Sequence, residues 1–572
     1  MVNQGKRMAL WRRLAPWSLG LLLLAASSLA ALPAYATPTG RPVNAEAPPT
    51  PVATGGNQAD HPVFLPFIAQ DDGVPNAALQ PTCPTPQQTY GRLFASLPQA
   101  TWATNDLNLL AMKSMAEAEL DPTPEGQVDD EENQDIDVGY TYVGQFIDHD
   151  LTLDNRPNDL TTPIDPKTVQ NFRTPKFDLD SVYGAGPSLS PQFYEADGMH
   201  LKVGAALSGS SDSHAADLLR DSNGQAIIGD PRNDENRIVA QLHTVFIRFH
   251  NKMVDSVRRA KPKLSASQVF SEAKNQALWH YQWAVLTDFL PTIVGAQTMQ
   301  AVARPNPAPN GPRWQTTLHY YNPCMNMPVE FSVAAYRFGH SMVRALYRIN
   351  STLPNRLPVF SNTNNTTLDL GGFSPAPSNF AIDWKFFFPM SPTRQVGIPQ
   401  SSYKMDASLV YPLSLLPLPA TGSGPANLAQ RNLLRGMQLG LPSGQDVARA
   451  LGVPPLRDDQ ILVGKASGDA ADTVAITTVS AAFAGKAPLW IYVLAEATAN
   501  AYPVKDGHTV GAQRAPFRLG AVGGQIVAET MVGLLKADAT SILHNPFQPL
   551  ATLTAPSGRF GFKELIRAAL AN

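Results

Sequence analysis

Three consecutive polar residues, Asp148, His149 and Asp150, stand at the centre of the stretch GQFIDHDLTLD, residues 144–154. Successive residues of an α-helix point about 100° apart, so these three side chains cannot all face one site. Gln145 precedes Asp148 by three residues and His149 by four, which places those three on one face. The pattern therefore predicts a polar pocket with His149 and a separate site with Asp150. An acidic helix end with one incidental histidine is the alternative.

A second acidic stretch, RTPKFDLDSVYG, follows at residues 173–184. Thr174, Lys176, Asp178 and Asp180 alternate along it, so that in an extended loop their side chains fall on one side. Two carboxylates, a hydroxyl and neighbouring carbonyl groups are the hard oxygen ligands that Ca²⁺ binds. Asp150 would complete this set. An ordinary acidic loop is the alternative.

Three further stretches each carry two polar residues three positions apart, which places each pair on one side of a helix. The pairs are Arg232 and Glu235 in GDPRNDENRIVAQLHTVFIRFHN, Arg337 and His340 in AAYRFGHSMVRALY, and Asn432 and Arg435 in NLAQRNLLRGMQLGLP. A surface ion pair explains the first pair equally well. A single histidine on an apolar helix is more often a satisfied core residue than a ligand. Each signal is weak when taken alone.

Amphipathic helical patterns dominate the chain after about residue 90. They lie at residues 105–120, 236–260, 266–290, 329–347, 427–440, 487–499 and 523–537, separated by loops rich in proline and glycine. The sequence shows no internal repeat and no alternating strand pattern of any length. We therefore predict a mainly α fold, with one large helical domain at residues 90–572, long irregular loops and little β structure.

The N-terminal segment is typical of an export signal. A basic start precedes an apolar run, and the small residues of Ala34-Tyr35-Ala36 form a cleavage pattern, which predicts a signal peptide at residues 1–36. A retained membrane anchor is the alternative. Residues 37–89 are rich in proline, alanine and threonine and predict a linker or N-terminal arm. We expect a secreted protein, extracellular or periplasmic, without stable membrane insertion after cleavage.

The composition narrows the possible partners. The formal net charge is -3 with histidine neutral, which argues against a nucleic-acid binder because such proteins normally carry a basic patch. The chain has two cysteines, Cys83 and Cys324, enough for one disulfide and too few for a thiolate metal cluster.

Taken together, and in this order, the polar stretches resemble the animal-type haem peroxidases of the peroxidase–cyclooxygenase superfamily. The resemblance extends over roughly residues 90 to 560 and includes APLWIYVLAEA and RLGAVGGQIVAETMVGLL, which look like late helices of that family. It implies a haem b-derived cofactor, one Ca²⁺ ion and hydrogen peroxide as a substrate.

On the distal side of the haem, the resemblance implies roles for five residues. His149 matches the catalytic histidine, Gln145 a glutamine of the haem pocket and Arg232 the distal arginine. Asp148 and Glu235 match the two carboxylates that form esters with the haem. Where one member, myeloperoxidase, has a methionine that forms a third, sulfonium link, this chain has Asn236, so that link is excluded.

On the proximal side, His340 matches the iron ligand and Asn432 the asparagine that accepts the N–H of that histidine. Arg337 and Arg435 match arginines near the haem propionates.

The calcium ligands implied by the resemblance are Asp150, Thr174, Lys176 through its carbonyl, Asp178 and Asp180. The position of Asp180 is commonly a serine. Three carboxylates exceed the charge of a divalent ion by one.

The resemblance implies an exported peroxidase that oxidises halides or thiocyanate, bromide and iodide more readily than chloride, or small phenols, through a ferryl haem intermediate. A haem-dependent fatty-acid dioxygenase is the alternative, but its radical-forming tyrosine would fall on Ile382, in FAIDWKFFFP, where Lys385 follows the tryptophan. A non-catalytic protein that binds haem and calcium is a second alternative.

Overall fold

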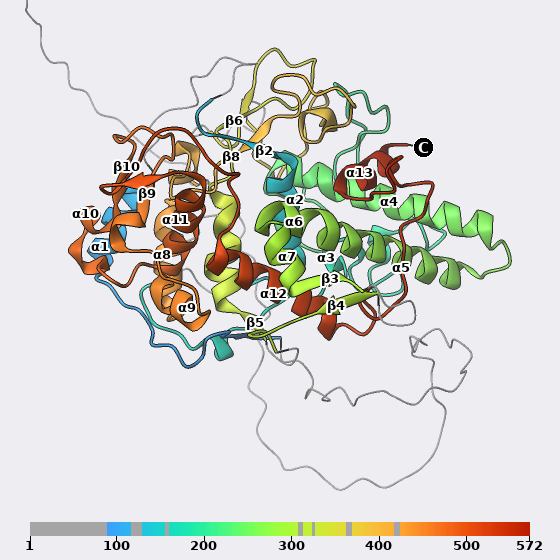
Figure 1. Cartoon of the computed structure of the whole chain (residues 1–572). Helices are drawn as coiled ribbons and strands as arrows, with labels where there is room; N and C mark the ends of the chain where they lie inside the picture. Colours follow the sequence, from blue (N-terminus) through green and yellow to red (C-terminus); the bar gives the residue numbers. More distant parts are fainter. Residues whose placement is uncertain are drawn as a thin grey trace, which may run out of the picture. The chain divides into compact units, whose positions relative to one another are not determined.

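Two long helices, α4 (Arg237–Ala260) and α5 (Ala266–Ala284), pack side by side and form one flank of the structure (Figure 1). Asn236 begins α4, because its side chain accepts hydrogen bonds from the backbone N–H groups of Ile238 and Val239. Ser265 and Gln268 form a capping box at the start of α5. The short connection between the two helices makes them antiparallel neighbours.

The computed structural model describes residues 88–115, 129–154, 160–306, 313–322, 326–361, 369–416 and 424–571. The predicted signal peptide, nearly all of the predicted linker, Cys83 and Cys324 lie outside these ranges. The remaining α-helices are α1 (Thr104–Lys113), α2 (Gly139–Leu151), α3 (Asp180–Tyr183), α6 (Leu290–Val294), α7 (Ala296–Val302), α8 (Leu428–Gln438), α9 (Gly444–Ala450), α10 (Ile476–Val479), α11 (Leu489–Ala501), α12 (Ala521–Ala537) and α13 (Phe562–Leu570).

The strands are short, and every strand pair in the described ranges forms a separate two-stranded sheet. The pairs are β1 (Tyr90–Gly91) with β5 (Met327–Pro328), β2 (Glu132–Asp137) with β8 (Ser401–Tyr403), β3 (Ala303–Pro305) with β4 (Trp314–Thr316), β6 (Leu346–Tyr347) with β7 (Leu357–Pro358), β9 (Leu462–Gly464) with β10 (Thr473–Ala475), and β11 (Val504–Lys505) with β12 (His508–Thr509). The prediction of a mainly α fold is confirmed.

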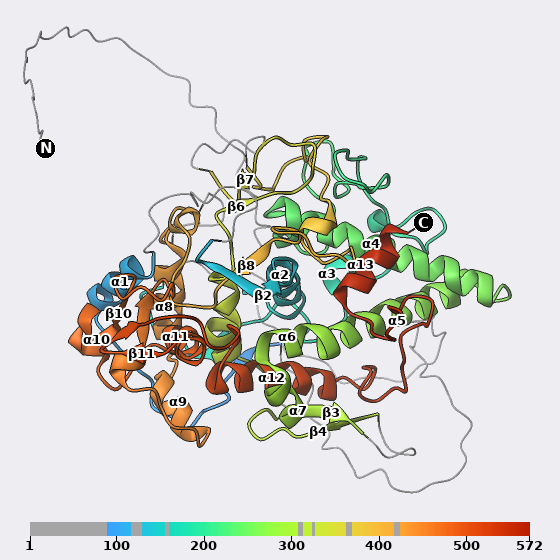
Figure 2. The ribbon, with the colours of Figure 1, turned by 45° about the horizontal axis from the view of Figure 1, so that its top comes forward.

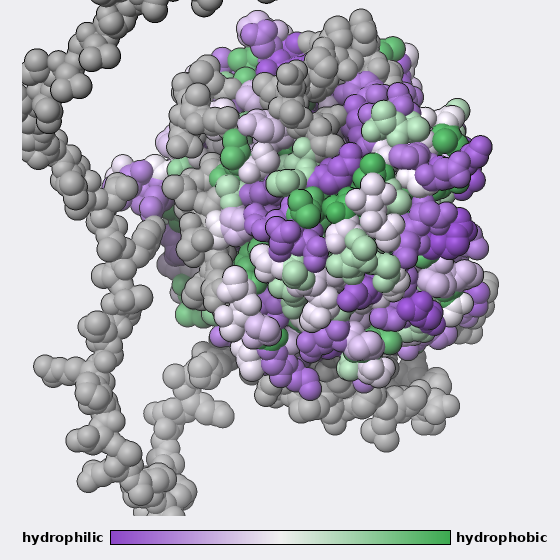
Figure 3. Space-filling view, turned by 90° about the vertical axis from the view of Figure 1, so that its left-hand side faces the viewer, coloured by the Kyte–Doolittle hydropathy of each residue, from purple (hydrophilic) through white to green (hydrophobic). Residues whose placement is uncertain are grey.

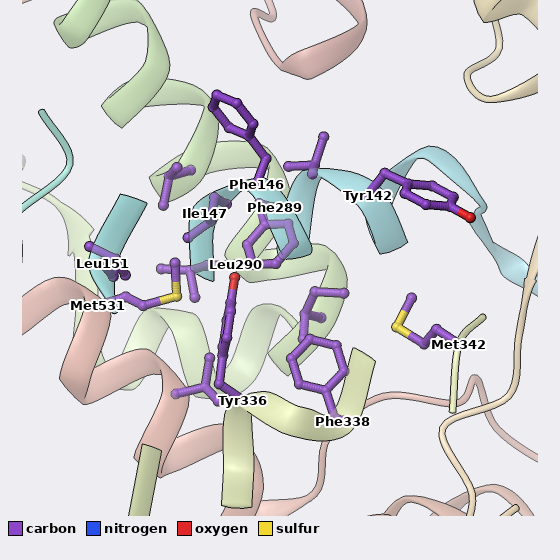
Figure 4. Close-up of a cluster of buried hydrophobic side chains, with 14 of the residues drawn as sticks. Tyr142, Phe146, Ile147, Leu151, Phe289, Leu290, Tyr336, Phe338, Met342 and Met531 are labelled. Atoms are coloured by element: carbon purple, nitrogen blue, oxygen red, sulfur yellow. The ribbon is translucent and has the colours of Figure 1, made fainter. Parts of the chain in front are cut away.

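Helix α2 lies between the α4–α5 pair and the group formed by α8, α9 and α11. Both views of the ribbon show this arrangement (Figure 1 and Figure 2). It begins at Gly139, whose N–H donates to the carbonyl of Phe387. A Cβ at Gly139 would lie only 2.3 Å from the ring of Phe388, so no larger residue fits there. Buried apolar side chains of α2 pack on α6, α12 and the segment that carries Tyr336, and the Tyr336 hydroxyl donates to the carbonyl of Gly144 (Figure 4).

The segment that carries His340 differs from the regular helix expected at residues 329–347. It consists of a π-helical stretch, η5 (Glu330–Ala334), and a 3₁₀ stretch, η6 (Ala335–His340). The change occurs at Ala334, whose backbone leaves the α region with φ −129° and ψ −74°. Residues three apart eclipse one another in a 3₁₀ helix, so Arg337 and His340 point to the same side.

The face shown in Figure 3 mixes hydrophilic residues with small, scattered groups of hydrophobic ones. Exposed large apolar side chains of the described residues include Met112 and Leu189. Among the helices of the described ranges, none has both the length and the apolar character needed to span a membrane.

Candidate active site

A cavity of about 620 Å³ lies between α2 and η6. Gln145, Asp148 and His149 line it from α2, and Arg337 and His340 line it from η6. The structure thus brings into one cavity the imidazoles of two segments that are almost two hundred residues apart. Asp150, the next residue on α2, points away into a different site, as the helical angles predict.

His149 is buried, with 4% of its surface exposed. Its Nδ1 atom lies 2.8 Å from Oδ1 of Asn233. Burial, helped by the nearby charge of Arg232, lowers the pKa of His149 from 6.5 to about 4. The imidazole is therefore uncharged at neutral pH and has one nitrogen with a free lone pair.

The carboxyl groups of Asp148 and Glu235 both line the cavity. Asp148 accepts a hydrogen bond from the hydroxyl of Thr152 at 3.0 Å, and Glu235 accepts one from the side-chain amide of Gln145. Burial is the largest cause that raises the pKa of Glu235 from 4.5 to about 7. Asn236 donates to Gln145 at 3.3 Å, so Gln145 is held from both sides.

Arg232 lies next to His149 but is not among the residues that line the cavity. Its guanidinium forms an ion pair with Asp230 at 2.7 Å and donates to the carbonyl groups of His149 and Thr152. Asp230 is fully buried and also accepts the backbone N–H of Arg232. Arg232 therefore supports the backbone of His149 from behind, while its charge disfavours a protonated imidazole.

A glycine loop closes the cavity beside Glu235. The N–H of Gly372 donates to the carbonyl of Glu235 at 3.0 Å, and Gly371 and Gly372 line the cavity. A Cβ at Gly372 would lie 1.6 Å from the carbonyl oxygen of Asp234, so only glycine permits this approach. The loop residues after Asp369 therefore fix the turn that carries Glu235.

Asn432 of α8 is a hydrogen-bonding neighbour of His340. The side-chain nitrogen of Asn432 lies 2.9 Å from Nδ1 of His340, and the side-chain oxygen accepts from Arg337 at 2.8 Å. This amide orientation is opposite to the expected one, in which Asn432 accepts the imidazole N–H. Binding of a metal through Nε2 of His340 requires a proton on Nδ1, so the amide must then turn and release Arg337.

The arginines near His340 are distributed differently from the expectation. Arg337 lines the cavity and is partly buried, and its pKa is lowered to about 10 because removal from water disfavours the cation. Arg435 does not line the cavity; it lies 3.6 Å from Asp154 and donates to Gln438. Arg431, one helical turn earlier on α8, lines the cavity instead. Four-residue spacing places both arginines on one helix face, and only the structure shows which one reaches the cavity.

The predicted cation site gathers three of its proposed ligands. Ligand oxygens of Asp150, Asp178 and Asp180 lie within 4.8 Å of one another. Asp150 is fully buried, and its Oδ1 atom has no hydrogen-bond partner among the described residues. Burial is the largest cause that raises the pKa of all three carboxyls, that of Asp178 to about 6. Repulsion within the cluster adds to this effect for Asp150 and Asp178, whereas for Asp180 the added repulsion comes from Asp230. A divalent cation would offset both effects by favouring the ionised carboxylates.

The local backbone explains how the carboxylates of Asp178 and Asp180 converge. Leu179 between them adopts the left-handed region with φ +53°, which is strained for a leucine. The hydroxyl of Thr174 donates to Asp178 at 2.8 Å, so it lies next to the cluster as expected. The amino group of Lys176 lies 3.7 Å from Asp538. The predicted calcium ligand of Lys176 is its backbone carbonyl, which does not involve that amino group.

The family model described as animal haem peroxidase matches residues 154–473 of this chain, more than half of its length. The chain belongs to the animal haem peroxidase family. The matched range includes Arg232, His340 and Asn432, whereas His149 lies just before it.

Similar proteins include chorion peroxidase of Aedes aegypti, 25% identical over 236 residues, which are 40% of this chain and 27% of that protein. Peroxinectin A of Dictyostelium discoideum is also 25% identical over 236 residues, 40% of this chain and 38% of that protein. The chain thus matches well under half the length of these relatives. A solved fatty acid alpha-dioxygenase of Arabidopsis thaliana has a TM-score of 0.50 at 16% identity, covering 83% of this chain and 74% of that one, and shows the same fold.

The haem implied by the animal haem peroxidase family fits the residues that line the cavity. Both imidazoles are uncharged at neutral pH because burial lowers their pKa, that of His340 to about 3, and an uncharged imidazole can bind iron. A Cβ placed on Gly339 would meet no atom within 4 Å, so the backbone beside His340 faces open space. Arg337 is a partly buried cation without an ion pair to any carboxylate of the described residues, which suits an acidic group on the cofactor.

The sequence predicted that Gln145, Asp148 and His149 share the face of α2 that lines the cavity. It did not identify three other residues that line the cavity or bind the residues around it: Asn233, Asp230 and Arg431. Asn233 and Asp230 stand within the stretch already selected for Arg232 and Glu235. The sequence pattern that could have identified Asp230 and Asn233 is a polar residue on each side of the dipeptide Pro231-Arg232. It indicates a capped 3₁₀ turn, which the structure contains as η3 (Pro231–Asp234).

Proposed function

We propose that this protein is an exported haem peroxidase that uses hydrogen peroxide to oxidise small donors. One observation supports the proposal most directly: His149 and His340, from segments far apart in the sequence, line the same cavity. A haem bound between them would supply an iron that activates peroxide for the oxidation of a second substrate.

His149 is the proposed acid–base residue. Its Nε2 atom would accept the proton from one oxygen of peroxide and return it to the other, which becomes water. This step requires an uncharged imidazole, and the lowered pKa of His149 keeps the ring uncharged well below neutral pH. Gln145, on the same face of α2, would position the incoming peroxide.

His340 would hold the iron through Nε2, with Asn432 turned so that its oxygen accepts the Nδ1 proton. A neutral acceptor donates less electron density to the metal than a carboxylate would, and therefore favours a higher iron potential. Arg337 and Arg431, both at the cavity, would bind the acidic groups of the cofactor, with Arg435 holding Asp154 nearby. Arg232 is proposed to stabilise negative charge on the departing oxygen.

Asp148 and Glu235 are proposed to form ester bonds to the haem. Both carboxyls face the cavity, and an ester at Asp148 removes a negative charge that would otherwise favour protonation of His149. Denaturation in acid butanone tests this proposal: haem that stays with the protein supports ester links, and haem that passes freely into the organic layer excludes them.

The proposed donors are bromide, iodide and thiocyanate, or small phenols, with chloride less favoured. Asn236 stands where a third covalent link to the haem would require a methionine, and its side chain instead caps α4 and holds Gln145. Without that link, we expect a lower oxidising power than chloride requires. Export rests on the N-terminal pattern at residues 1–36 alone.

One Ca²⁺ ion is proposed to bind Asp150, Thr174, Asp178, Asp180 and the carbonyl of Lys176. The clustered carboxylates and the partnerless oxygen of Asp150 support a hard divalent cation at this position.

The deciding experiment is an absorption spectrum of the holoprotein before and after one equivalent of peroxide, followed by bromide or thiocyanate. We expect His149→Ala to retain haem but lose the reaction with peroxide, and His340→Ala to lose or misplace haem. A His149→Ala protein that reacts like the wild type would exclude the proposed role. Oxygen uptake on addition of linoleate would instead support the fatty-acid dioxygenase.

A further inference from the structure

A buried chain of hydrogen bonds extends from His149 away from the cavity. His149 Nδ1 lies 2.8 Å from Oδ1 of Asn233, and Nδ2 of Asn233 lies 3.0 Å from Nδ1 of His243 on α4. All three side chains are almost completely buried, with Asn233 at 0% and His243 at 1% exposure. Water cannot replace either hydrogen bond, so the protons must be arranged to satisfy both.

The amide of Asn233 makes the two ends of this chain unequal. Its oxygen only accepts and its nitrogen only donates, so the histidine facing the oxygen must carry a proton on Nδ1, and the histidine facing the nitrogen must not. In an uncharged imidazole, one ring nitrogen carries the proton and the other carries a lone pair. With the oxygen toward His149, that ring has its proton on Nδ1 and its lone pair on Nε2.

The surroundings hold Asn233 and His243 in place. Asn233 belongs to η3, where its backbone N–H donates to the carbonyl of Asp230. The ring of His243 packs edge-on against Phe146 of α2, with ring centres 6.1 Å apart, and Phe146 stacks on Phe246. Helix α4 therefore presents the acceptor to Asn233 from the same core that positions α2.

We propose that Asn233 is a positioning residue that fixes His149 as the Nδ1-protonated tautomer, with His243 setting the orientation of the Asn233 amide. The inference rests on the proposed function, because only that tautomer leaves Nε2 free to accept the proton of peroxide. Reversal of the amide would place the proton on Nε2 and occupy the atom that must act as the base. Sequence spacing gives no indication of this pairing, since Asn233 and His149 are 84 residues apart.

The direct test is the tautomer in the holoprotein. Long-range ¹H–¹⁵N spectra of ¹⁵N-histidine-labelled protein, in the diamagnetic ferrous carbon monoxide form at pH 7, separate protonated from unprotonated ring nitrogens. Loss of the signals in His149→Gln assigns them to His149. We expect a protonated Nδ1 and an unprotonated Nε2; the opposite pattern refutes the proposal without the need for any Asn233 variant.

The second test uses three variants. Asn233→Leu has a similar volume but no acceptor, and should lower the second-order rate constant with peroxide by about 10²-fold. Haem absorption and the rate of the donor step should stay unchanged. His243→Phe, which frees the amide to reverse, should cause a smaller loss in the same step. His250→Phe is the matched control: it removes another buried histidine of α4, which binds Tyr183 and Met199, and should retain the wild-type rate constant.

The outcomes separate the inference from the function on which it rests. A wild-type rate constant in Asn233→Leu, together with an inactive His149→Ala, overturns the role of Asn233 and leaves His149 as the base. A reactive His149→Ala overturns the proposed function itself.

Discussion

Lowering the pH protonates His149, whose pKa is reduced from 6.5 to about 4 by burial and by the charge of Arg232. An imidazole accepts a proton from peroxide only while it is uncharged. The second-order rate constant should therefore be constant near neutral pH and fall as the pH decreases through about 4. The shift corresponds to about 3 kcal/mol in the free energy of protonation.

The lowered pKa of His149 changes the rate constant most at pH values between about 4 and 6.5. At pH 5, a histidine with a pKa of 4 is about 90% uncharged, whereas one with a pKa of 6.5 is about 3% uncharged. The rate constant at pH 5 should thus be about 30-fold higher than an ordinary histidine would allow.

Stopped-flow mixing of the holoprotein with peroxide between pH 3.5 and 8 measures this dependence, since the second-order rate constant reports groups of the free enzyme. Arg232→Gln should move the midpoint upward, because it removes a cation that disfavours the imidazolium. His250→Phe should leave the midpoint unchanged. Haem absorption and circular dichroism at each pH identify any acid unfolding. A wild-type midpoint near 6.5 in folded protein would refute this account of His149.

Three further outcomes are expected. Gly372→Ala should destabilise the fold by several kcal/mol, since its Cβ would overlap the carbonyl of Asp234; thermal unfolding measures this, with Gly524→Ala as the control, because a Cβ there comes no closer than 3.5 Å to a neighbouring atom. Prolonged chelation should lower the thermal midpoint of the wild type, and Asp178→Asn should bind Ca²⁺ more weakly by isothermal titration; equal affinity would exclude Asp178 as a ligand. Arg337→Leu should lower the affinity of the apoprotein for haem before any ester forms, measured by titration with haem in the absence of peroxide, and unchanged affinity would contradict its proposed contact with the cofactor.

The fold class and the division of α2 between two sites could be predicted because both depend on local periodicity. The spacing of Asp148, His149 and Asp150 determines their directions on any helix, and the structure contains that helix. The prediction that His340 shares a site with His149 came from the family resemblance. Spacing alone could not give it, because no local rule relates segments so far apart in the sequence.

Other features depended on contacts that the sequence does not encode locally. The choice between Arg431 and Arg435 follows from how α8 packs, since both lie on one helix face. The π and 3₁₀ form of the segment around Arg337 replaces the regular helix that its periodicity indicated. The orientation of the Asn432 amide follows from competition between His340 and Arg337 for its two ends, a tertiary effect.

The cation cluster and the catalytic side of the molecule are connected by charge as well as by α2. Arg173 lies 3.0 Å from Asp180 and 3.7 Å from Asp230, and Asp230 in turn binds Arg232, whose guanidinium donates to the carbonyl of His149. A Ca²⁺ ion bound there would leave one negative charge of the three carboxylates uncompensated, and Arg173 is placed to offset that charge. Because the same arginine also faces Asp230, the electrostatic balance of the proposed metal site would extend to the ion pair behind His149. Metal binding would therefore hold His149 from two directions, through the next residue of its own helix and through Arg232.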